Sequence, residues 1–207
     1  MKLETLLKPL GIHISQEDES IEINGLAFDS SNIKPNYLFV AIPGTQTDGH
    51  MYIEDAILNG ACVVIGEEKL TTIGVPYFRV ANSRKTIGLL ANIFYVNPTQ
   101  HKIMIGITGT NGKTTTSYML KHILESAGIS CSLFGSVSTI INGIENKSTH
   151  TTVDAVTVNQ LLAMCNDQVV IMEVSSHGLI QYRVEGMQFD YCIFTNLEPE
   201  HLDYHKT

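Results

Sequence analysis

Short apolar runs alternate with helical periodicities along the first half of the chain. Residues 3–10 have the spacing of a short amphipathic helix. The runs IEINGLAF, YLFVAI, ACVVIG and PYFRV predict strands, and the turn-rich segment DSSNIKPN separates the first two. Residues 48–60 have helical spacing and end at Gly60, and a second helix is expected from a Ser83 cap to about Asn97. This order predicts a small α/β module.

The second half continues the alternation with longer elements. KIMIGIT predicts a strand, which a glycine turn joins to a helix from about Lys113 to Ala127. CSLFGSVSTI predicts one strand, and NGIENKS predicts a hairpin or loop. A helix is expected over residues 154–164, followed by strands at QVVIMEV and FDYCIFTN. Nearly continuous apolar strands between helices are typical of a parallel sheet covered on both faces.

We place the domain boundary near residues 97–101, which gives domains of residues 1–98 and 99–207. The second domain would hold three or four parallel strands, which is few for this architecture. We therefore expect the chain to be a fragment of a longer protein, with its second domain incomplete.

Composition narrows the possible partners. The formal net charge of −8 argues against a non-specific nucleic-acid binder, although one site can still attract anions. The start of the chain is too short and too charged for a signal peptide, and no apolar run approaches the roughly 18 residues of a membrane span. A cytoplasmic protein without nucleic-acid or membrane partners is expected, and the oligomeric state is not predicted.

The four cysteines, at positions 62, 131, 165 and 192, show no CxxC spacing. Cys62, Cys131 and Cys192 lie in apolar runs. We therefore expect buried, reduced thiols rather than a disulfide or zinc framework.

The stretch GITGTNGKTTT places a glycine turn between a strand and a helix start. Gly109 and Gly112 let successive N–H groups face one concavity, and the helix N-terminus adds positive potential. Lys113 would reach the β- and γ-phosphates, and Thr114 would offer its hydroxyl to Mg²⁺. A strict Walker A motif would have glycine at position 107, where this chain has isoleucine. The alternative is a plain strand–turn–helix connection with an incidental lysine.

Carboxylates and histidines follow two later strands. Glu173 ends the run QVVIME, where open α/β sheets bind ligands, and it could hold Mg²⁺ directly or through water. A capping or salt-bridged role is the alternative. The segment FTNLEPEHLDYH carries Glu200, His201, Asp203 and His205, which could form a metal or phosphate shell or a solvated loop.

These stretches together resemble the Mur ligase family, the ATP-dependent amide ligases of peptidoglycan synthesis. GTNGKTTT resembles the ATP loop of the family. MEVSSHGL with QYRV, TNLEPEHLDYHKT, and the segment from DSSNIKPNYLFVAIPG to ACVVI resemble the branch that adds the third amino acid. The likeness covers nearly the whole chain from Leu26 onward and implies a small N-terminal α/β UDP-binding domain followed by an incomplete, mostly parallel-sheet P-loop ATPase domain.

The resemblance also implies roles for single residues. ATP would be bound by Gly109, Thr110, Asn111, Gly112, Lys113, Thr114 and Thr115. The Mg²⁺ shell would be Thr114, Glu173 and His201, and the catalytic residues would be Lys113, Glu173 and His201. The UDP-muramoyl-peptide substrate would contact Phe28, Ser30, Thr45, Gln46, Thr47, His150, Thr151, Thr152, Ser175, Gln181 and Arg183.

Three departures from the pattern of the branch stand out. Ser31 replaces an arginine near the expected uridine site, and Val153 replaces a proline. Glu200 replaces the aspartate before His201 and adds a methylene beside an expected metal ligand. The family's carbamate-modified lysine and its amino-acid-binding domain would lie beyond Thr207.

The implied reaction joins an amino acid to UDP-N-acetylmuramoyl-L-alanyl-D-glutamate through an acyl phosphate, with ATP and Mg²⁺ as cofactors. Lys113, the loop N–H groups and Mg²⁺ would offset the repulsion between two anions, and no protein nucleophile is required. Another Mur-type or folyl-polyglutamate-type ligase is one alternative, although the UDP-binding segment disfavours the folate branch. A fragment that binds nucleotide or UDP-sugar without turnover is the other.

Overall fold

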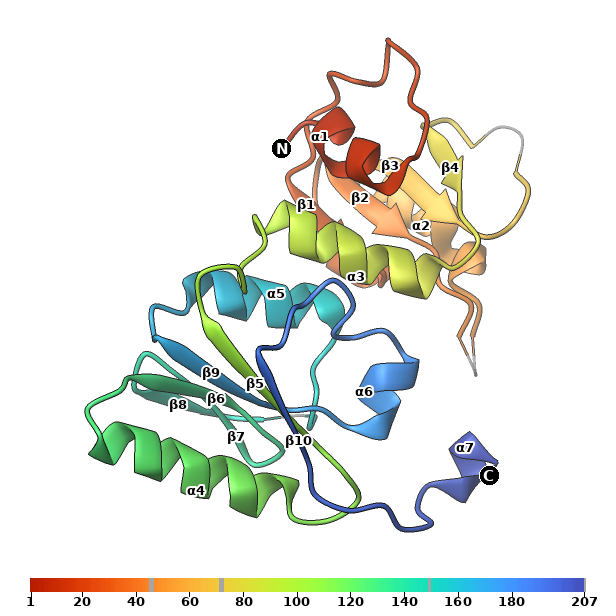
Figure 1. Ribbon diagram of the computed structural model, residues 1–207. Helices are drawn as coiled ribbons and strands as arrows, with labels where there is room; N and C mark the ends of the chain where they lie inside the picture. Colours follow the sequence, from red (N-terminus) through yellow and green to blue (C-terminus); the bar gives the residue numbers. More distant parts are fainter. Residues whose placement is uncertain (45–46, 71–72, 149, 207) are drawn as a thin grey trace. The chain divides into compact units, whose positions relative to one another are not determined.

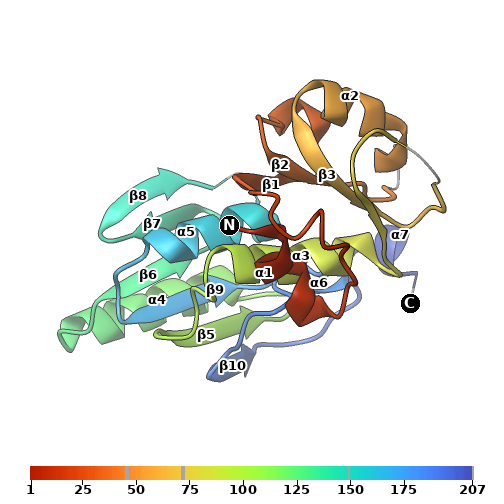
Figure 2. The same ribbon diagram turned by 90° about the horizontal axis from the view of Figure 1, so that it is seen from above.

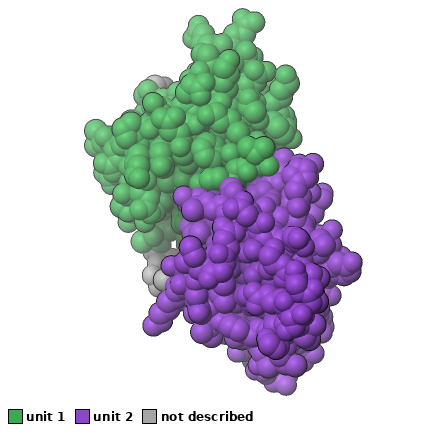
Figure 3. Space-filling model, turned by 90° about the vertical axis from the view of Figure 1, so that its left-hand side faces the viewer, with its two compact units in different colours: residues 1–96 green, residues 97–207 purple. Residues whose placement is uncertain are grey.

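Strands and helices alternate along the chain, and the strands form two sheets (Figure 1). The computed structural model describes residues 1–44, 47–70, 73–148 and 150–206. The chain divides into unit 1, Met1–Val96, and unit 2, Asn97–Thr207, which Figure 3 colours separately. Within the described ranges, no helix is both long enough and apolar enough to cross a membrane.

Four parallel strands in chain order form the sheet of unit 1: β1 (Gly25–Ala27), β2 (Tyr37–Val40), β3 (Ala61–Gly66) and β4 (Tyr77–Arg79). Leu38 and Phe39 point to opposite faces of β2 and are both fully buried, so both faces of the sheet are covered. One face carries α2 (Ile53–Leu58), and the other carries α1 (Leu3–Leu7) and α3 (Ser83–Phe94), as Figure 2 shows. The connections contain the 3₁₀ helices η1 (Lys8–Leu10), η2 (Ser30–Asn32) and η3 (Gly49–Tyr52).

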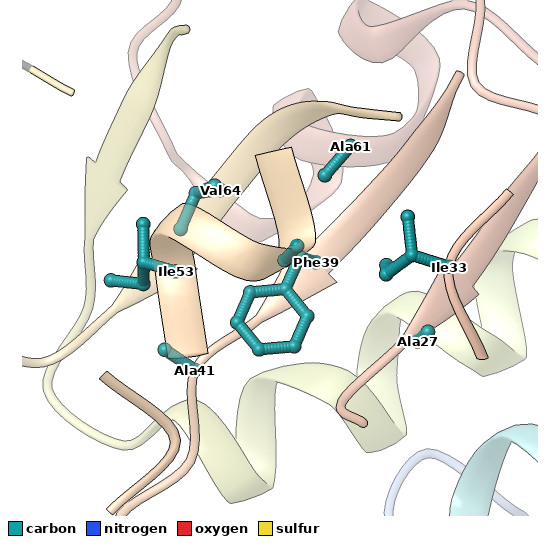
Figure 4. Close-up of a cluster of buried hydrophobic side chains, with 8 residues drawn as sticks. Ala27, Ile33, Phe39, Ala41, Ile53, Ala61 and Val64 are labelled. Carbon is teal, nitrogen blue, oxygen red and sulfur yellow. The ribbon is translucent and has the colours of Figure 1, made fainter. Parts of the chain in front are cut away.

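The core of unit 1 beside α2 is built around Phe39 (Figure 4). Smaller apolar side chains from the strands, from α2 and from the connection after η2 surround this ring: Ala27, Ile33, Ala41, Ile53, Ala56, Ala61 and Val64. These residues come from the apolar runs of the sequence, which explains why the alternation predicted the module.

Unit 2 contains a six-stranded sheet in the order β10-β5-β9-β6-β7-β8. The strands are β5 (Ile103–Thr108), β6 (Cys131–Phe134), β7 (Ser138–Ile141), β8 (Ile144–Lys147), β9 (Val169–Glu173) and β10 (Tyr191–Phe194). The first four in this order are parallel, and β7 and β8 are antiparallel additions. The predicted mostly parallel α/β class is confirmed.

Helices cover both faces of this sheet. Ile105 and Ile107 of β5 pack on the side of α4 (Lys113–Ser126), whereas Met104 packs on the side of α5 (Ala155–Met164). Two short helices follow later strands, α6 (Ser176–Ile180) after β9 and α7 (Leu202–His205) after β10.

The expectation of one strand over CSLFGSVSTI is wrong. The chain reverses after Phe134, so that Leu133 lies opposite Ile140 and Phe134 opposite Thr139 in an antiparallel pair. A backbone hydrogen bond from the Gly135 N–H to the Ser138 carbonyl, 3.1 Å long, closes the turn that reverses the chain. The apolar pattern hides this turn because residues on both sides of it are strand formers.

NGIENKS forms the turn and second strand of a hairpin, one of the two predicted outcomes. Asn142 and Gly143 have φ values of 53° and 77°, as the tight turn between twisted antiparallel strands requires.

The cap and the end of α3 and the exposure of one cysteine differ from the prediction. Asn82, not Ser83, caps α3, because the Asn82 side chain accepts the N–H of Lys85 at 2.8 Å. The helix ends at Phe94 rather than near Asn97. Cys192 is exposed, whereas Cys131 and Cys165 are buried and Cys62 is half-buried. The reason is that β10 is an edge strand among the described residues, with only β5 beside it.

Candidate functional site

The carboxyl ends of three neighbouring strands meet at one edge of the unit 2 sheet. Thr108 at the end of β5 lies opposite Phe194 of β10, and Ile107 lies opposite Glu173 of β9. Parallel sheets bind ligands outside these ends. The predicted phosphate loop, Glu173 and the segment after β10 therefore lie at the same edge of the sheet.

The phosphate loop, Gly109–Gly112, depends on its glycines. Gly109 and Gly112 have φ values of 130° and 84°. A Cβ atom on Gly109 would lie 2.8 Å from the Asn196 carbonyl oxygen and would collide with the Thr195 hydroxyl, so a larger residue does not fit. Gly112 is the N-cap of α4 and turns the chain into the helix.

The Lys113 side chain folds back onto this loop and forms hydrogen bonds with it. Its ammonium donates to the carbonyl oxygens of Gly109, at 2.6 Å, and Thr110, at 2.9 Å. The N–H groups in the first turn of α4 have no acceptor within the helix, and the helix dipole makes this end positive. A cation, free N–H donors and a helix N-terminus thus converge on one concavity, which suits a phosphate group.

Glu173 is fully buried directly behind the loop. Its carboxylate accepts hydrogen bonds from the hydroxyl of Thr114 at 2.9 Å and from Ser117 at 3.2 Å. Ser136 donates to it twice, from its hydroxyl at 2.8 Å and from its N–H at 3.3 Å. Among the described residues no cationic side chain pairs with Glu173, and Ser175 caps the following helix, so the salt-bridged and capping alternatives do not hold there.

A cleft of about 940 Å³ opens at this edge. Its walls come from the phosphate loop with Thr114 and Thr115, from Ser136 and Thr151, from the start of α6 and from the segment after β10. His201 and His205 line the same cleft. Glu173 lies behind the wall, and its donors Thr114 and Ser136 stand between its carboxylate and the cleft.

Five further predicted substrate residues lie at or behind the cleft, in unit 2. Thr151 and Ser175 line it. Thr152 is buried, and its hydroxyl donates to the Glu173 carbonyl at 3.1 Å. Arg183 donates to the Thr152 carbonyl and to the Gln181 side chain, so these three residues form one connected group.

The structure describes four further predicted substrate residues, His150 in unit 2 and three in unit 1. His150 is exposed and borders a much smaller pocket beside Phe134. Phe28, Ser30 and Thr47 belong to unit 1, where Phe28 is 40% exposed and the Ser30 carbonyl accepts from the Asn59 amide at 3.0 Å. Thr45 and Gln46 lie outside the described residues.

His201 belongs to a cluster of aromatic side chains at the mouth of the cleft. Its ring centroid lies 4.7 Å from that of His177, which lies 5.2 Å from that of His205. Burial lowers the pKa of His177, and repulsion from the neighbouring His201, His205 and Arg183 side chains lowers it further. This environment therefore favours the neutral form of His177 over the protonated form.

Sequence reasoning missed two groups of residues at this edge. Ser117 and Ser136 hold Glu173, and Thr195, Asn196 and Glu198 contact the phosphate loop. Polar residues at two strand ends, in FGSVS and FTNLE, were the only signal for these residues, except for Ser117, which lies within α4 and gave none. Their partners lie far away along the chain, so the pairing cannot be seen in the sequence.

Two domain patterns place this fold in a family. The pattern of the Mur ligase middle domain matches residues 107–207, and that of the Mur ligase family, catalytic domain, matches residues 22–95. The chain belongs to the Mur ligase family, which confirms the resemblance. Mur ligases in general use ATP and Mg²⁺.

Comparison with curated relatives shows which ligases of the family this chain is similar to. The chain is 41% identical over 211 residues to the UDP-N-acetylmuramoyl-L-alanyl-D-glutamate--2,6-diaminopimelate ligase of Caldanaerobacter subterraneus subsp. tengcongensis. It is 42% identical over 212 residues to the protein of that name from Phocaeicola vulgatus. All of this chain but only 44% of each relative is aligned, so the chain spans less than half their length.

Solved structures give the same fold. A structure of a ligase with that name aligns with a TM-score of 0.84 and 26% identity, over 100% of this chain and 42% of the other. The MurF ligase of Thermotoga maritima in complex with ADP aligns with a TM-score of 0.58 over 88% of this chain and 39% of the other. The second pair is 24% identical and shows a shared fold alone.

Proposed function

We propose that this chain is the N-terminal and central part of an ATP-dependent ligase of peptidoglycan precursor synthesis. The complete protein would join an amino acid to UDP-N-acetylmuramoyl-L-alanyl-D-glutamate by way of an acyl phosphate. The relatives are named for 2,6-diaminopimelate, which makes it the first amino acid to test. Unit 1 would bind the UDP part of the substrate, and the cleft of unit 2 would bind ATP.

One arrangement carries this proposal: Lys113 and the first residues of α4 line the cleft, while Glu173 stands behind the Thr114 hydroxyl. The ammonium and N–H groups would hold the phosphates and offset the charge that develops on the transferred phosphoryl group. The substrate carboxylate would attack that group and ADP would leave. The amine of the amino acid would then displace phosphate from the acyl phosphate, so no protein nucleophile is needed.

The oxygen donors at the cleft fit Mg²⁺, which prefers hydroxyl and carboxylate oxygens together with water. Thr114 would offer its hydroxyl oxygen to the ion. Glu173 would accept a hydrogen bond from that hydroxyl or from a bound water. When bound, Mg²⁺ would supply charge neutralisation between the phosphates. His201 lines the same cleft and is the proposed third contributor.

Nucleotide binding by this chain tests the proposal. The wild-type chain should bind Mg·ATP in calorimetry, and K113A should weaken binding about 10- to 100-fold, because hydrogen bonds to a charged group contribute about 1.5–3 kcal/mol. K147A, at an exposed residue of β8, is the matched control and should bind as the wild type does. Equal binding by K113A and the wild type would mean that the loop has another task.

The second candidate is a binding fragment without turnover, and the length of the relatives favours it for the chain by itself. This chain should bind UDP-muramoyl dipeptide and Mg·ATP yet form no tripeptide. Folate binding without UDP binding would instead favour a folyl-polyglutamate-type ligase.

A further inference from the structure

The segment after β10 runs along the phosphate loop and bonds to it residue by residue. The Thr195 N–H donates to the Thr108 carbonyl at 3.0 Å, and the Thr110 N–H donates to the Asn196 carbonyl at 3.0 Å. The Glu198 N–H donates to the Thr110 hydroxyl at 2.9 Å. We call Thr195, Asn196 and Glu198 the brace. These three residues belong to the stretch TNLEPEHLDYHKT, but the proposed phosphate site gives them no role.

The Asn196 side chain forms hydrogen bonds with both the N–H and the carbonyl of a single loop residue. Its Oδ1 accepts the Asn111 N–H at 2.8 Å, and its Nδ2 donates to the Asn111 carbonyl at 3.0 Å. The Thr195 hydroxyl donates to the same carbonyl at 2.7 Å. An amide side chain matches this donor–acceptor pair, whereas a carboxylate or a hydroxyl supplies only part of it.

The brace divides the loop's N–H groups into two sets. Those of Thr110 and Asn111 already have acceptors on the brace and point away from a ligand. Those at the start of α4 have no intrahelical acceptor and face the cleft. With the first two groups fixed, the glycines on either side can keep their positive φ values and hold the second set convergent.

We propose that Asn196 and Thr195 are positioning residues that hold the phosphate loop in its anion-receptive shape. This inference rests on the proposed nucleotide site but adds residues that do not touch the ligand. A loop that visits the receptive shape only part of the time binds more weakly by that fraction. Without the brace, binding falls although every phosphate-contacting group is still present.

A merely structural brace would fasten β10 to β5 and leave nucleotide binding unchanged. The two roles differ in what a variant loses. A structural role predicts lower stability with normal affinity in the folded fraction. A positioning role predicts lower affinity and faster exchange of the Asn111 amide, with little change in melting temperature, because the brace contacts are largely exposed.

The experiment measures Mg·ADP affinity by calorimetry, Asn111 amide exchange by NMR, and melting temperature on the same samples. N196A should bind about tenfold more weakly, the factor expected if the loop keeps its receptive shape about a tenth of the time. T195V retains the shape of the side chain without its hydroxyl and should also bind more weakly, whereas T195S should restore wild-type affinity. N146A, at an exposed residue of β8, is the matched control.

The outcomes separate this inference from the proposed function. Wild-type chain that does not bind Mg·ADP overturns both. Wild-type binding with unaltered affinity in N196A and T195V overturns the brace alone. If N196A does not fold, the comparison of T195V with T195S decides the question by itself.

Discussion

At the scale of the residue, hydrogen-bond partners decide what a side chain can do. Asp48, His50 and Glu68 place possible metal-ligand atoms within 4.8 Å of one another in unit 1. Yet Nδ1 of His50 lies 2.6 Å from the Asp48 carboxylate, and Nε2 accepts the Glu67 N–H at 2.8 Å. Both ring nitrogens are engaged, so His50 joins two turns rather than offering a nitrogen to a metal.

A pH-dependent contribution to stability follows from Asp48. Hydrogen bonds from the His50 N–H and ring lower the pKa of Asp48 below its ordinary value. A carboxyl whose pKa is lowered by folding stabilises the protein above its unfolded pKa of about 3.9 and loses that effect as pH falls through the folded pKa. Asp48→Asn keeps an acceptor for the His50 N–H and removes only the charge, so it should reduce the free energy of unfolding at pH 7 by at most about 1 kcal/mol, as for other exposed charged pairs.

Urea unfolding measured from pH 7 down to pH 3 checks this prediction. The gap between the wild type and Asp48→Asn should narrow on acidification. Glu17→Gln, at an exposed position of the same unit, is the control and should leave stability unchanged. A gap of constant size across this pH range would show that the carboxylate charge of Asp48 plays no part.

At the scale of the element, the sequence predicted what local patterns encode. Apolar runs located the strands, and Gly60 and the Asn-Gly pair at 142–143 marked a helix end and a turn. The reversal after Phe134 was missed, because strand formers flank it on both sides. The exposure of β10 was also missed, because an apolar run does not reveal whether a strand has one neighbour or two.

The candidate site divides in the same way. The phosphate loop is contiguous, so its glycines and Lys113 could be recognised from spacing. Glu173 could be placed because it ends a buried run. Its serine donors and the brace depend on contacts between residues about 37 to 88 positions apart, as in the bond from Glu198 to Thr110, and such contacts leave no local pattern.

The cap of α3 gives a prediction at this scale. Asn82 accepts the Lys85 N–H, whereas the Ser83 hydroxyl donates to Glu67 at 2.8 Å and is turned away from the helix end. Asn82→Ala should lower the free energy of unfolding by about 1 kcal/mol, because one N–H of the first turn loses its acceptor. Asn82→Asp keeps the acceptor and should remain near the wild type. Urea denaturation followed by circular dichroism measures the stability of both variants. An Asn82→Ala variant as stable as the wild type would disprove the assigned cap.

At the scale of the whole molecule, the two edges of the unit 2 sheet differ in chemistry. The outer strand β8 reads Ile-Glu-Asn-Lys, and all four residues are exposed. Charges on an edge strand discourage pairing with another chain. At the opposite edge, β10 reads Tyr-Cys-Ile-Phe, with Tyr191 and Phe194 each 63% exposed. This second edge is apolar and uncharged in the described part of the chain, so it is the one open to unwanted pairing.

The apolar edge predicts that this chain associates with itself as its concentration rises. Tyr191→Lys places a charge on β10 and should reduce the associated fraction in sedimentation velocity, measured with reductant present because Cys192 is exposed. Ile144→Lys adds the same charge to the other edge, where Ile144 is 66% exposed, and should leave association as in the wild type. Equal effects of the two variants would indicate that net charge, rather than the β10 edge, controls association. A monomer at every concentration would mean that the twist of β10 already protects its unpaired backbone groups.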